Sequence, residues 1–564
     1  MKNFLTTLSE YTPAMLSGFL LTMSFPKADL SWLAWVALVP LILSLYRLDG
    51  KLSANKAFKT GFVMGICHFL CLIYWIVPTI SVYGQLPLYL AVPILLLLAG
   101  YLALYPAVFA WGINLFGAAD KKSLMPLTAA LLWVCLEYIR SILFTGFPWG
   151  LAGYSQYMNL NLVQIADITS VYGVSFIIVL TNGVLSMVWI TFFVPSGNEL
   201  TNGATSPVSK AFPIPSRQTF MSAIQTTGQA AGKRETILWA FCLVAIFSGL
   251  FSYGKIRIAS IEKISAASER VNISVVQGNI EQVFKWDEDY QESTITKYCQ
   301  LSRQAAKLEP DLIVWPETAL PFYYSWNKKM SAMVDECIKE SETTFLIGSP
   351  AFRKVDEASK TYDIFNRAYM INKLGVVTGS YDKVHLVPFG EYVPFGRYLS
   401  FLGKIIAQSG DFSSGKKDVA PLAFNGSSAG VQICFEMIFP YLSRVAVKNG
   451  AQILITMTND AWFGYTSAPW QHFTMATFRA IENRRAVARA ANTGISGFID
   501  PSGKILQVSN LFEERFLTNS MPSLTIKTIY SSYGDFFAFI CLFAIGVAGV
   551  LKLRTFLKNS PKQC

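Results

Sequence analysis

The stretch Val431-Gln432-Ile433-Cys434-Phe435-Glu436 runs from a short β-branched segment into a cysteine and a glutamate. From residue 271 onward, similar β-branched runs alternate with helical stretches, which predicts an α/β domain within 255–530. The predicted strands are 271–277, 312–315, 344–349, 366–372, 430–434, 452–456 and 495–499, and the predicted helices are about 288–307, 327–341, 441–449 and 470–490. Functional groups in such domains gather beyond the carboxyl ends of strands. Because Cys434 ends its strand, we expect a nucleophilic thiol exposed on a sharp turn.

Two other stretches place charged residues after predicted strands. They are Val314-Trp315-Pro316-Glu317 and Asp382-Lys383-Val384-His385-Leu386-Val387-Pro388-Phe389-Gly390-Glu391. Partial burial would raise the pKa of Glu317 and make it a general base near neutral pH. A fixed Lys383 ammonium would lower the pKa of a nearby thiol and stabilise an oxyanion, with Glu391 holding either that cation or the substrate amine. A Glu, a Lys and a Cys brought together can therefore make and break acyl bonds.

Each of these three residues also has an ordinary structural interpretation. Taken singly, Glu317 is a loop residue, Lys383 a surface lysine and Cys434 a buried packing cysteine. Their joint occurrence in one polar region favours the functional interpretation. A thiol forms a thioester, which amines attack readily, so this nucleophile favours transfer to nitrogen over simple hydrolysis.

The rest of the chain is unusually apolar. Hydrophobic residues make up 52% of the 564 residues and charged residues 15%, with a mean hydropathy of +0.38. Such a composition excludes an ordinary soluble protein, and a helix needs about 20 apolar residues to cross a bilayer. We predict about eight membrane spans, at residues 12–26, 30–47, 57–79, 88–113, 125–144, 163–194, 236–253 and 533–552.

The distribution of Lys and Arg predicts the orientation of these spans. Most basic residues outside 255–530 fall on one side of the membrane, and the loops 80–87 and 145–162 on the other side have none. Both termini are therefore expected in the cytoplasm and 255–530 on the far side. The formal charge of +11 comes mainly from the basic residues that flank the predicted spans, and it does not indicate a nucleic-acid partner.

The expected domains follow from this topology. They are a transmembrane bundle of seven spans at 1–254 with an inner loop at 195–235, a catalytic domain at 255–530, and a last transmembrane helix with a basic tail at 531–564.

The order Glu317, Lys383, Cys434 resembles the catalytic triad of the nitrilase superfamily. The chain resembles the apolipoprotein N-acyltransferase family over essentially its full length. The resemblance lies in the spans and in the motifs Trp-Pro-Glu, Lys-x-His-Leu-Val-Pro-Phe-Gly-Glu-Tyr-Val-Pro and Cys-Phe-Glu. Further matching stretches are Val276-Gln277-Gly278-Asn279-Ile280 with Lys285-Trp286, Asn459-Asp460-Ala461-Trp462-Phe463-Gly464, and Arg485 through Asn492-Thr493-Gly494. Two departures are Phe435, where Tyr is common, and Ala486, where Pro is frequent.

The resemblance implies an α-β-β-α sandwich in the periplasm, inserted before the last span of a multi-pass protein of the bacterial inner membrane. It implies acyl transfer from a phospholipid to the N-terminal amine of a diacylated lipoprotein, by a ping-pong reaction through a thioester. The residue roles it implies are Glu317 as base, Lys383 as transition-state stabiliser, Cys434 as nucleophile, Glu391 and Glu436 as supporting acids, and Trp286, Phe435, Trp462 and Phe463 on the substrate side.

A thioester must meet an amine before water, so the site needs apolar cover. In segment 394–406, apolar residues near helical spacing predict an amphipathic lid or membrane arm, with an ordinary core helix as the alternative. The residues in question are Phe395, Tyr398, Leu399 and Leu402. His385 is interpreted as a structural partner of Lys383 and His472 as a helix-start residue. No ligand spacing indicates a metal, and no cofactor is expected.

Two other functions remain open at this point. A membrane-anchored amidase or nitrilase would pass the acyl group to water, and the triad alone does not exclude it. A transporter or binding protein with an inactive enzyme domain is disfavoured by the intact triad and by the few charges within the spans. The sequence does not specify the oligomeric state, and a monomer is our working expectation.

Overall fold

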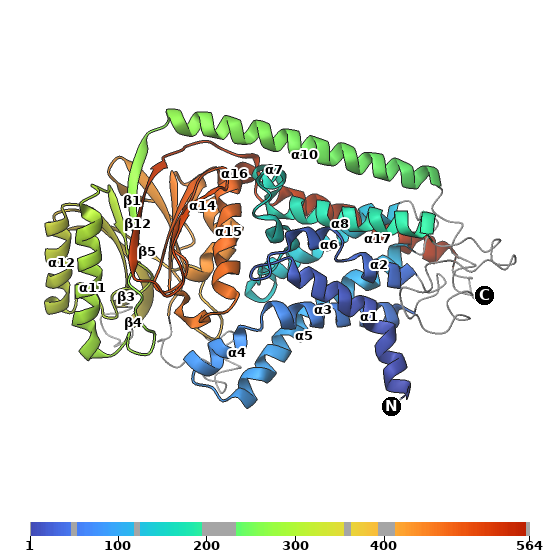
Figure 1. Ribbon diagram of the computed structural model, residues 1–564, viewed down its shortest axis with the longest axis horizontal. Helices are drawn as coiled ribbons and strands as arrows, with labels where there is room; N and C mark the ends of the chain where they lie inside the picture. The colour runs from blue at the N-terminus through green and yellow to red at the C-terminus, as the bar shows by residue number, and fades with distance from the viewer. Residues whose placement is uncertain are drawn as a thin grey trace.

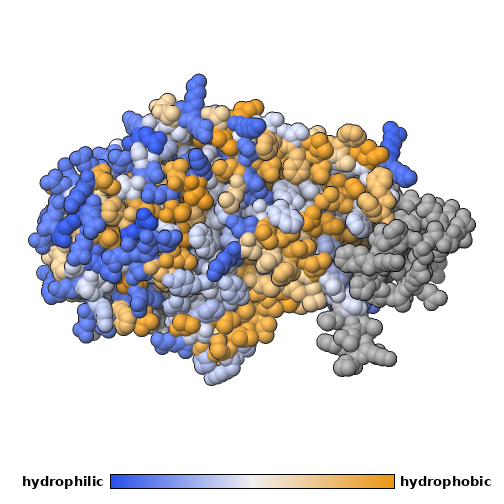
Figure 2. Space-filling model, in the orientation of Figure 1, coloured by the Kyte–Doolittle hydropathy of each residue, from blue (hydrophilic) through white to orange (hydrophobic). Residues whose placement is uncertain are grey.

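The protein is divided into a helical part and an α/β part that lie end to end (Figure 1). The computed structural model describes residues 2–46, 53–117, 124–193, 233–354, 362–392 and 412–559. Figure 2 shows apolar residues concentrated over the helical part and hydrophilic residues over the opposite end, where α11 and α12 lie. This division is what a chain with one end in a membrane requires.

The helical part contains most of the chain before residue 254 and the last helix. Its elements are α1 (Lys2–Met23), η1 (Ser31–Trp35), α2 (Val39–Tyr46), α3 (Ala54–Leu72), α4 (Ile76–Pro78), η2 (Thr79–Tyr83), α5 (Leu88–Gly117), α6 (Met125–Ile142), η4 (Leu143–Thr145), η5 (Ala152–Gln156), α7 (Leu160–Val163), α8 (Ala166–Phe193), α10 (Lys233–Ala267) and α17 (Phe536–Asn559).

Several of these helices are long and apolar enough to cross a membrane. Within the described residues five pass by length and composition, namely Leu88–Phe116, Met125–Thr145, Ala166–Phe193, Lys233–Ala267 and Phe536–Thr555. A sixth passes if Ala54–Leu72 and Ile76–Tyr83, bent by 56°, form one span. The predicted count of eight is not confirmed, because 30–47 divides into η1 and α2, and α1 carries polar residues and Pro13.

Helix α10 connects the two parts without a break. It is 35 residues long and continues past residue 254 to Ala267, close to the first strand of the α/β part. In Figure 1 it runs beside the helical part and ends next to β1. Helix α10 therefore leads from the helical part directly to the first strand of the α/β part.

The α/β part is a sandwich of two six-stranded sheets. One sheet has the order β12-β1-β2-β3-β4-β5 and the other β11-β10-β9-β8-β7-β6. Helices α11 (Glu288–Ala306) and α12 (Lys328–Ser341) cover the first sheet. Helices α14 (Pro440–Lys448) and α15 (Ala468–Asn483) cover the second, on the side that faces the helical part (Figure 1). This is the expected α-β-β-α arrangement.

The strands combine predicted and unpredicted segments. They are β1 (Arg270–Gln277), β2 (Leu312–Val314), β3 (Thr344–Lys354), β4 (Tyr362–Ile371), β5 (Val377–Asp382), β6 (Leu422–Phe424), β7 (Ser427–Ile433), β8 (Ile453–Thr458), β9 (Ala486–Ala491), β10 (Gly497–Ile499), β11 (Ile505–Val508) and β12 (Arg515–Pro522). Strands β1, β2 and β3 pair in parallel, as do β7, β8 and β9, so the carboxyl ends within each set meet at one edge.

One predicted helix, over 470–490, is wrong in its second half. Helix α15 ends at Asn483, Arg484 adopts a left-handed conformation with φ 50°, and Ala486–Ala491 forms β9. The Ala-rich sequence of β9, Ala-Val-Ala-Arg-Ala-Ala, favours a helix locally. Its fully buried place between β8 and β10 determines the outcome instead.

Buried polar contacts join the α/β part to the helical part. The Arg484 guanidinium lies 2.7 Å from the Asp167 carboxylate of α8, and Arg257 of α10 donates to the same carboxylate at 2.8 Å. In addition, the Ser170 hydroxyl donates to Glu482 Oε1 at 2.6 Å. Because Asp167 and Arg484 are almost completely buried, the junction depends on these pairs remaining complete.

Replacement of Asp167 by alanine should destabilise the protein strongly. It leaves the buried Arg484 guanidinium without its carboxylate, which costs about 3–5 kcal/mol in comparable buried pairs. The matched control is Arg353→Ala, which breaks an exposed pair with Asp363 and should cost about 1 kcal/mol or less. Thermal unfolding in detergent micelles compares the two variants, and equal shifts would contradict the structural role of the Asp167 pair.

Candidate active site

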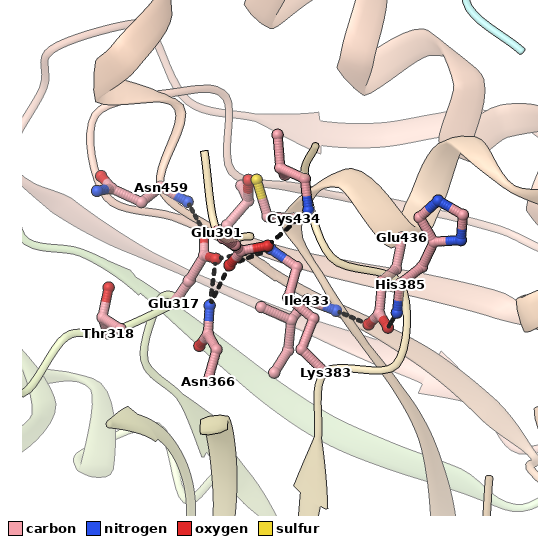
Figure 3. A network of polar contacts seen from close by, with 12 residues as sticks. Glu317, Thr318, Asn366, Lys383, His385, Glu391, Ile433, Cys434, Glu436 and Asn459 are labelled. Atoms are coloured by element: carbon pink, nitrogen blue, oxygen red, sulfur yellow. Dashed lines mark hydrogen bonds and ion pairs between the residues drawn. The ribbon is translucent and has the colours of Figure 1, made fainter. Parts of the chain in front are cut away.

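The ends of three strands bring the predicted triad together (Figure 3). Glu317 follows β2, Lys383 follows β5 directly, and Cys434 follows β7 directly. The Lys383 ammonium lies 3.3 Å from Glu317 Oε1 and 3.0 Å from Glu391 Oε1. The Cys434 side chain lies beside this group in Figure 3, and the charges of Glu317 and Lys383 both act on its thiol. Residues from three distant segments thus form one site.

The Glu317 carboxylate is held at both oxygens. Oε1 accepts a hydrogen bond from the Asn366 side-chain amide at 2.8 Å, and Oε2 accepts from the backbone N–H of Asn459 at 2.9 Å. Asn366 also donates to Glu391 Oε1 at 3.2 Å, so the amide links the two acids. These contacts restrict Glu317 to one orientation before any substrate binds.

The pKa of Glu317 lies below its ordinary value, which corrects the expected rise. Burial raises the pKa of this carboxyl, but the ammonium groups of Lys383 and Lys285 and the Asn366 hydrogen bond together lower it further than burial raises it. Glu317 is therefore ionised at neutral pH. An ionised carboxylate in this position is able to accept a proton without a raised pKa.

Lys383 remains charged in its buried position. Burial lowers the pKa of its ammonium, but Glu317 and Glu391 together raise that pKa above the ordinary value. Glu391 is itself fixed, because its Oε2 accepts from the backbone N–H of Val387 at 2.8 Å. A permanent cation with little freedom to move suits the stabilisation of a developing oxyanion.

Lys285 is a second buried ammonium that the sequence interpretation did not select. Its Nζ donates to the Glu317 carbonyl at 3.2 Å and to the Thr318 hydroxyl at 3.0 Å. Burial lowers the pKa of Lys285 to about 8, against the attraction of Glu317 and Cys434. The available signal was its place in the apolar run Val283-Phe284-Lys285-Trp286.

Cys434 occupies a sharp turn, as expected. Its φ is 53°, a left-handed conformation that non-glycine residues rarely adopt, and the thiol is partly buried. Burial raises the pKa of the thiol, and the Glu317 carboxylate raises it further. The Lys383 ammonium lowers this pKa by less than the other two raise it, so the pKa lies above its ordinary 9.0. The resting enzyme therefore holds a neutral thiol that needs a base.

Glu436 connects the Cys434 turn to the Lys383 segment. Its carboxylate accepts from the backbone N–H groups of Ile433 and Val384, each at 2.7 Å. It also accepts from the Tyr381 hydroxyl at 2.8 Å. Burial raises the pKa of Glu436 to about 7, and these donors limit the rise. Glu436 is a bridge between two loops of the site.

Two family matches together cover most of the chain. Residues 17–184 match the apolipoprotein N-acyltransferase N-terminal domain, and residues 272–530 match the carbon-nitrogen hydrolase family. The apolipoprotein N-acyltransferase of Geobacter metallireducens is 40% identical over 97% of this chain and 95% of its own length. The chain belongs to the apolipoprotein N-acyltransferase family. It is therefore an amide-forming acyltransferase with a nitrilase-like domain.

Two further proteins are similar to this acyltransferase at lower sequence identity. The apolipoprotein N-acyltransferase of Methylococcus capsulatus is 28% identical over 98% of both chains. A crystal structure of a carbon-nitrogen hydrolase from Helicobacter pylori G27 is 16% identical, with a TM-score of 0.36, and covers 47% of this chain and 94% of its own.

The predicted substrate-side aromatic residues of the acyltransferase lie in different places. Phe463 contacts Trp75 and Trp149 of the helical part, with ring centroids 5.0 and 6.2 Å apart, and Trp462 contacts Tyr83 at 6.3 Å. These two aromatic residues therefore face the helical part.

Phe435 packs on Phe439 at 5.3 Å, next to the Cys434 turn. Trp286 instead lines a separate cavity of about 850 Å³ that also contains Tyr323 and Trp326. The predicted lid residues Phe395, Tyr398, Leu399 and Leu402 lie outside the described residues.

The raised pKa of Cys434 predicts how the thiol reacts with an alkylating agent. Because the pKa of the thiol lies above its ordinary 9.0, the thiolate fraction still rises through pH 9, and alkylation by iodoacetamide should keep accelerating up to and beyond that pH. Peptide mass spectrometry at Cys434 between pH 6 and 10 measures this rate, with a free model thiol as control. A plateau below pH 8 would show a resting thiolate and contradict the assignment.

Proposed function

We propose that this acyltransferase moves a fatty acyl chain from a membrane phospholipid to the free N-terminal amine of a diacylglyceryl-cysteine lipoprotein, through a thioester on Cys434. The observation that carries the proposal is an ionised Glu317 and a charged Lys383 held 3.3 Å apart beside a neutral thiol. Such a group can activate a thiol and stabilise an oxyanion within one site.

In the first half-reaction Glu317 accepts the thiol proton as Cys434 Sγ attacks an ester carbonyl of the phospholipid. Lys383 and backbone N–H groups stabilise the negative charge on the carbonyl oxygen. The C–O bond then breaks, the lysophospholipid oxygen takes the proton from Glu317, and the acyl chain remains on Cys434 as a thioester. Lysophospholipid leaves before the acceptor enters.

In the second half-reaction the lipoprotein amine attacks the thioester carbonyl. Glu317 accepts a proton from the amine, the C–S bond breaks, and the proton passes to the Cys434 sulfur. The product is an amide and the thiol is restored. Both substrates use one site in turn, so the reaction follows ping-pong kinetics.

The surroundings of Cys434 favour transfer to an amine over loss to water. Phe435 follows the nucleophile and packs on Phe439. Phe463 packs against Trp75 and Trp149, and Trp149 stacks on His472, which donates to the Cys434 carbonyl. Apolar side chains near a thioester limit the access of water. Glu391 and Glu436 support the reaction by fixing Lys383 and the Cys434 turn.

The proposed topology places both termini in the cytoplasm and residues 255–530 in the periplasm, in a multi-pass protein of the inner membrane. Residues 1–254 and 531–564 then form the membrane part. The asymmetry of Lys and Arg around the apolar segments supports this orientation. The apolar surface beside the α/β part, seen in Figure 2, is consistent with an active site close to lipid.

A trapped thioester tests the mechanism directly. Purified enzyme mixed with labelled phospholipid, without acceptor, should carry one acyl chain on Cys434 by mass spectrometry, and Cys434→Ala should carry none. Addition of a diacylated lipopeptide with a free amine should convert the adduct to amide. No adduct on the unmodified protein would exclude the mechanism, and release of free fatty acid alone would indicate a hydrolase.

The same assay separates the roles of the charged residues. Glu317→Gln removes the base and Lys383→Met removes the cation, and each should slow thioester formation by about 10²–10⁴-fold. Lys307→Met is the matched control, because this lysine is exposed at the C-terminal end of α11 and lies outside the site. A change of less than about 3-fold in the two active-site variants would contradict their assigned roles.

A further inference from the structure

A buried charged cluster lies under the nucleophile and takes no part in the proposed mechanism. It consists of Asp460, His472 and Arg489, which come from the segment after β8, from α15 and from β9. All three side chains are at most 1% exposed. Charged groups are costly to bury, so a cluster of this kind next to an active site calls for a physical explanation.

The hydrogen bonds in this cluster determine the tautomer of His472. Arg489 Nη2 donates to Asp460 Oδ2 at 2.7 Å and to His472 Nδ1 at 3.0 Å. Nδ1 also lies 3.2 Å from Asp460 Oδ1, so the contacts of Nδ1 alone do not decide which ring nitrogen carries the proton. Nε2 decides it, because it lies 3.1 Å from the backbone carbonyl oxygen of Cys434, which can only accept. Nε2 therefore donates to this carbonyl, and Nδ1 of the neutral ring accepts from Arg489. Burial and the Arg489 charge lower the pKa of His472, so the ring stays neutral.

The carbonyl that His472 holds belongs to a strained residue. Cys434 has a φ of 53°, and such conformations persist only where the surroundings impose them. A donor fixed on the Cys434 carbonyl restricts the rotation of that peptide group, and with it the direction in which Sγ points. The cluster therefore acts on the nucleophile through its backbone.

The short segment after β8 serves both partners of the proton transfer. The Thr458 hydroxyl donates to Asp460 Oδ1 at 2.8 Å, which fixes the acid of the cluster. The backbone N–H of Asn459, one residue earlier than Asp460, donates to Glu317. One rigid turn thus sets the position of the base directly and that of the thiol through His472.

The helical part covers the other side of the His472 ring. The Trp149 indole stacks on it, with centroids 5.7 Å apart and planes 29° from parallel. The Trp149 carbonyl in turn accepts a hydrogen bond from Arg140 at 2.8 Å. His472 is therefore held between a charged anchor in the α/β part and an aromatic wall from the helical part, with little room to rotate.

We propose that His472, locked by Asp460 and Arg489, is a positioning residue that fixes the Cys434 turn for attack on the acyl donor. The inference rests on the proposed thioester function. His472 is not an acid or base in the reaction, because both ring nitrogens are occupied, one by Arg489 and the other by the Cys434 carbonyl. Its contribution is to the rate of thioester formation rather than to the binding of phospholipid.

Two isosteric variants test this role. His472→Gln can place an amide N–H near the position of Nε2 and restore the bond to the Cys434 carbonyl. His472→Asn can place an amide near Nδ1 and keep contact with Arg489, but it is too short to reach that carbonyl. Because small misplacements of a reacting group cost up to about 100-fold, thioester formation should be about 10–100-fold slower in the Asn variant, and the Gln variant should recover most of the rate.

The measurement is single-turnover thioester formation at several phospholipid concentrations. The expected result is a lower maximal rate for His472→Asn with an unchanged half-saturation concentration, and thermal unfolding shows that both variants are folded. Equal rates for the Asn variant and the unmodified enzyme, or equal loss in the Asn and Gln variants, would overturn the proposal. Absence of any adduct on the unmodified enzyme would instead refute the proposed function.

Discussion

The structure of the active site depends on one buried ammonium shared by two carboxylates. Lys383 lies within 3.3 Å of Glu317 and 3.0 Å of Glu391, and all three side chains are buried. Two carboxylates and one ammonium would leave a net negative charge in a medium of low dielectric. Lys285 supplies the fourth charge, and backbone N–H groups satisfy the carboxylate oxygens that face away from Lys383. The charges of these two carboxylates and two ammonium groups therefore sum to zero.

This neutrality explains why the nucleophile rests as a thiol. A thiolate would add a fifth, unbalanced charge to a dry site, and the nearby Glu317 carboxylate opposes it. In the proposed mechanism the negative charge forms only as the sulfur attacks, when the proton moves to Glu317 and the charge moves to an oxygen near Lys383. The negative charge thus moves from the Glu317 carboxylate to the substrate oxygen, and the total charge of the site does not change. For this reason Glu317 does not need a raised pKa to accept the thiol proton.

The sequence predicted the residues that follow strands, since strand ends are marked by local patterns. Glu317 and Cys434 lie next to β-branched runs whose burial is readable from composition alone. The sequence did not predict β9, because its four alanines favour a helix and only its place between β8 and β10 makes it a strand. Lys285 and His472 were not selected because their importance comes from contacts with residues more than 30 positions away.

Helix α15 explains why the two parts behave as one enzyme. Its first turns carry His472, which holds the Cys434 carbonyl, and its C-terminal end leads to Arg484, which pairs with Asp167 of α8. The same helix thus contacts the nucleophile at one end and a membrane-part carboxylate at the other. The nucleophile turn and the buried Asp167 pair are thus connected through one continuous helix. A catalytic domain linked only by a flexible tether would lack this connection, and the His472 ring that holds the Cys434 carbonyl would lack the Trp149 indole that stacks on it.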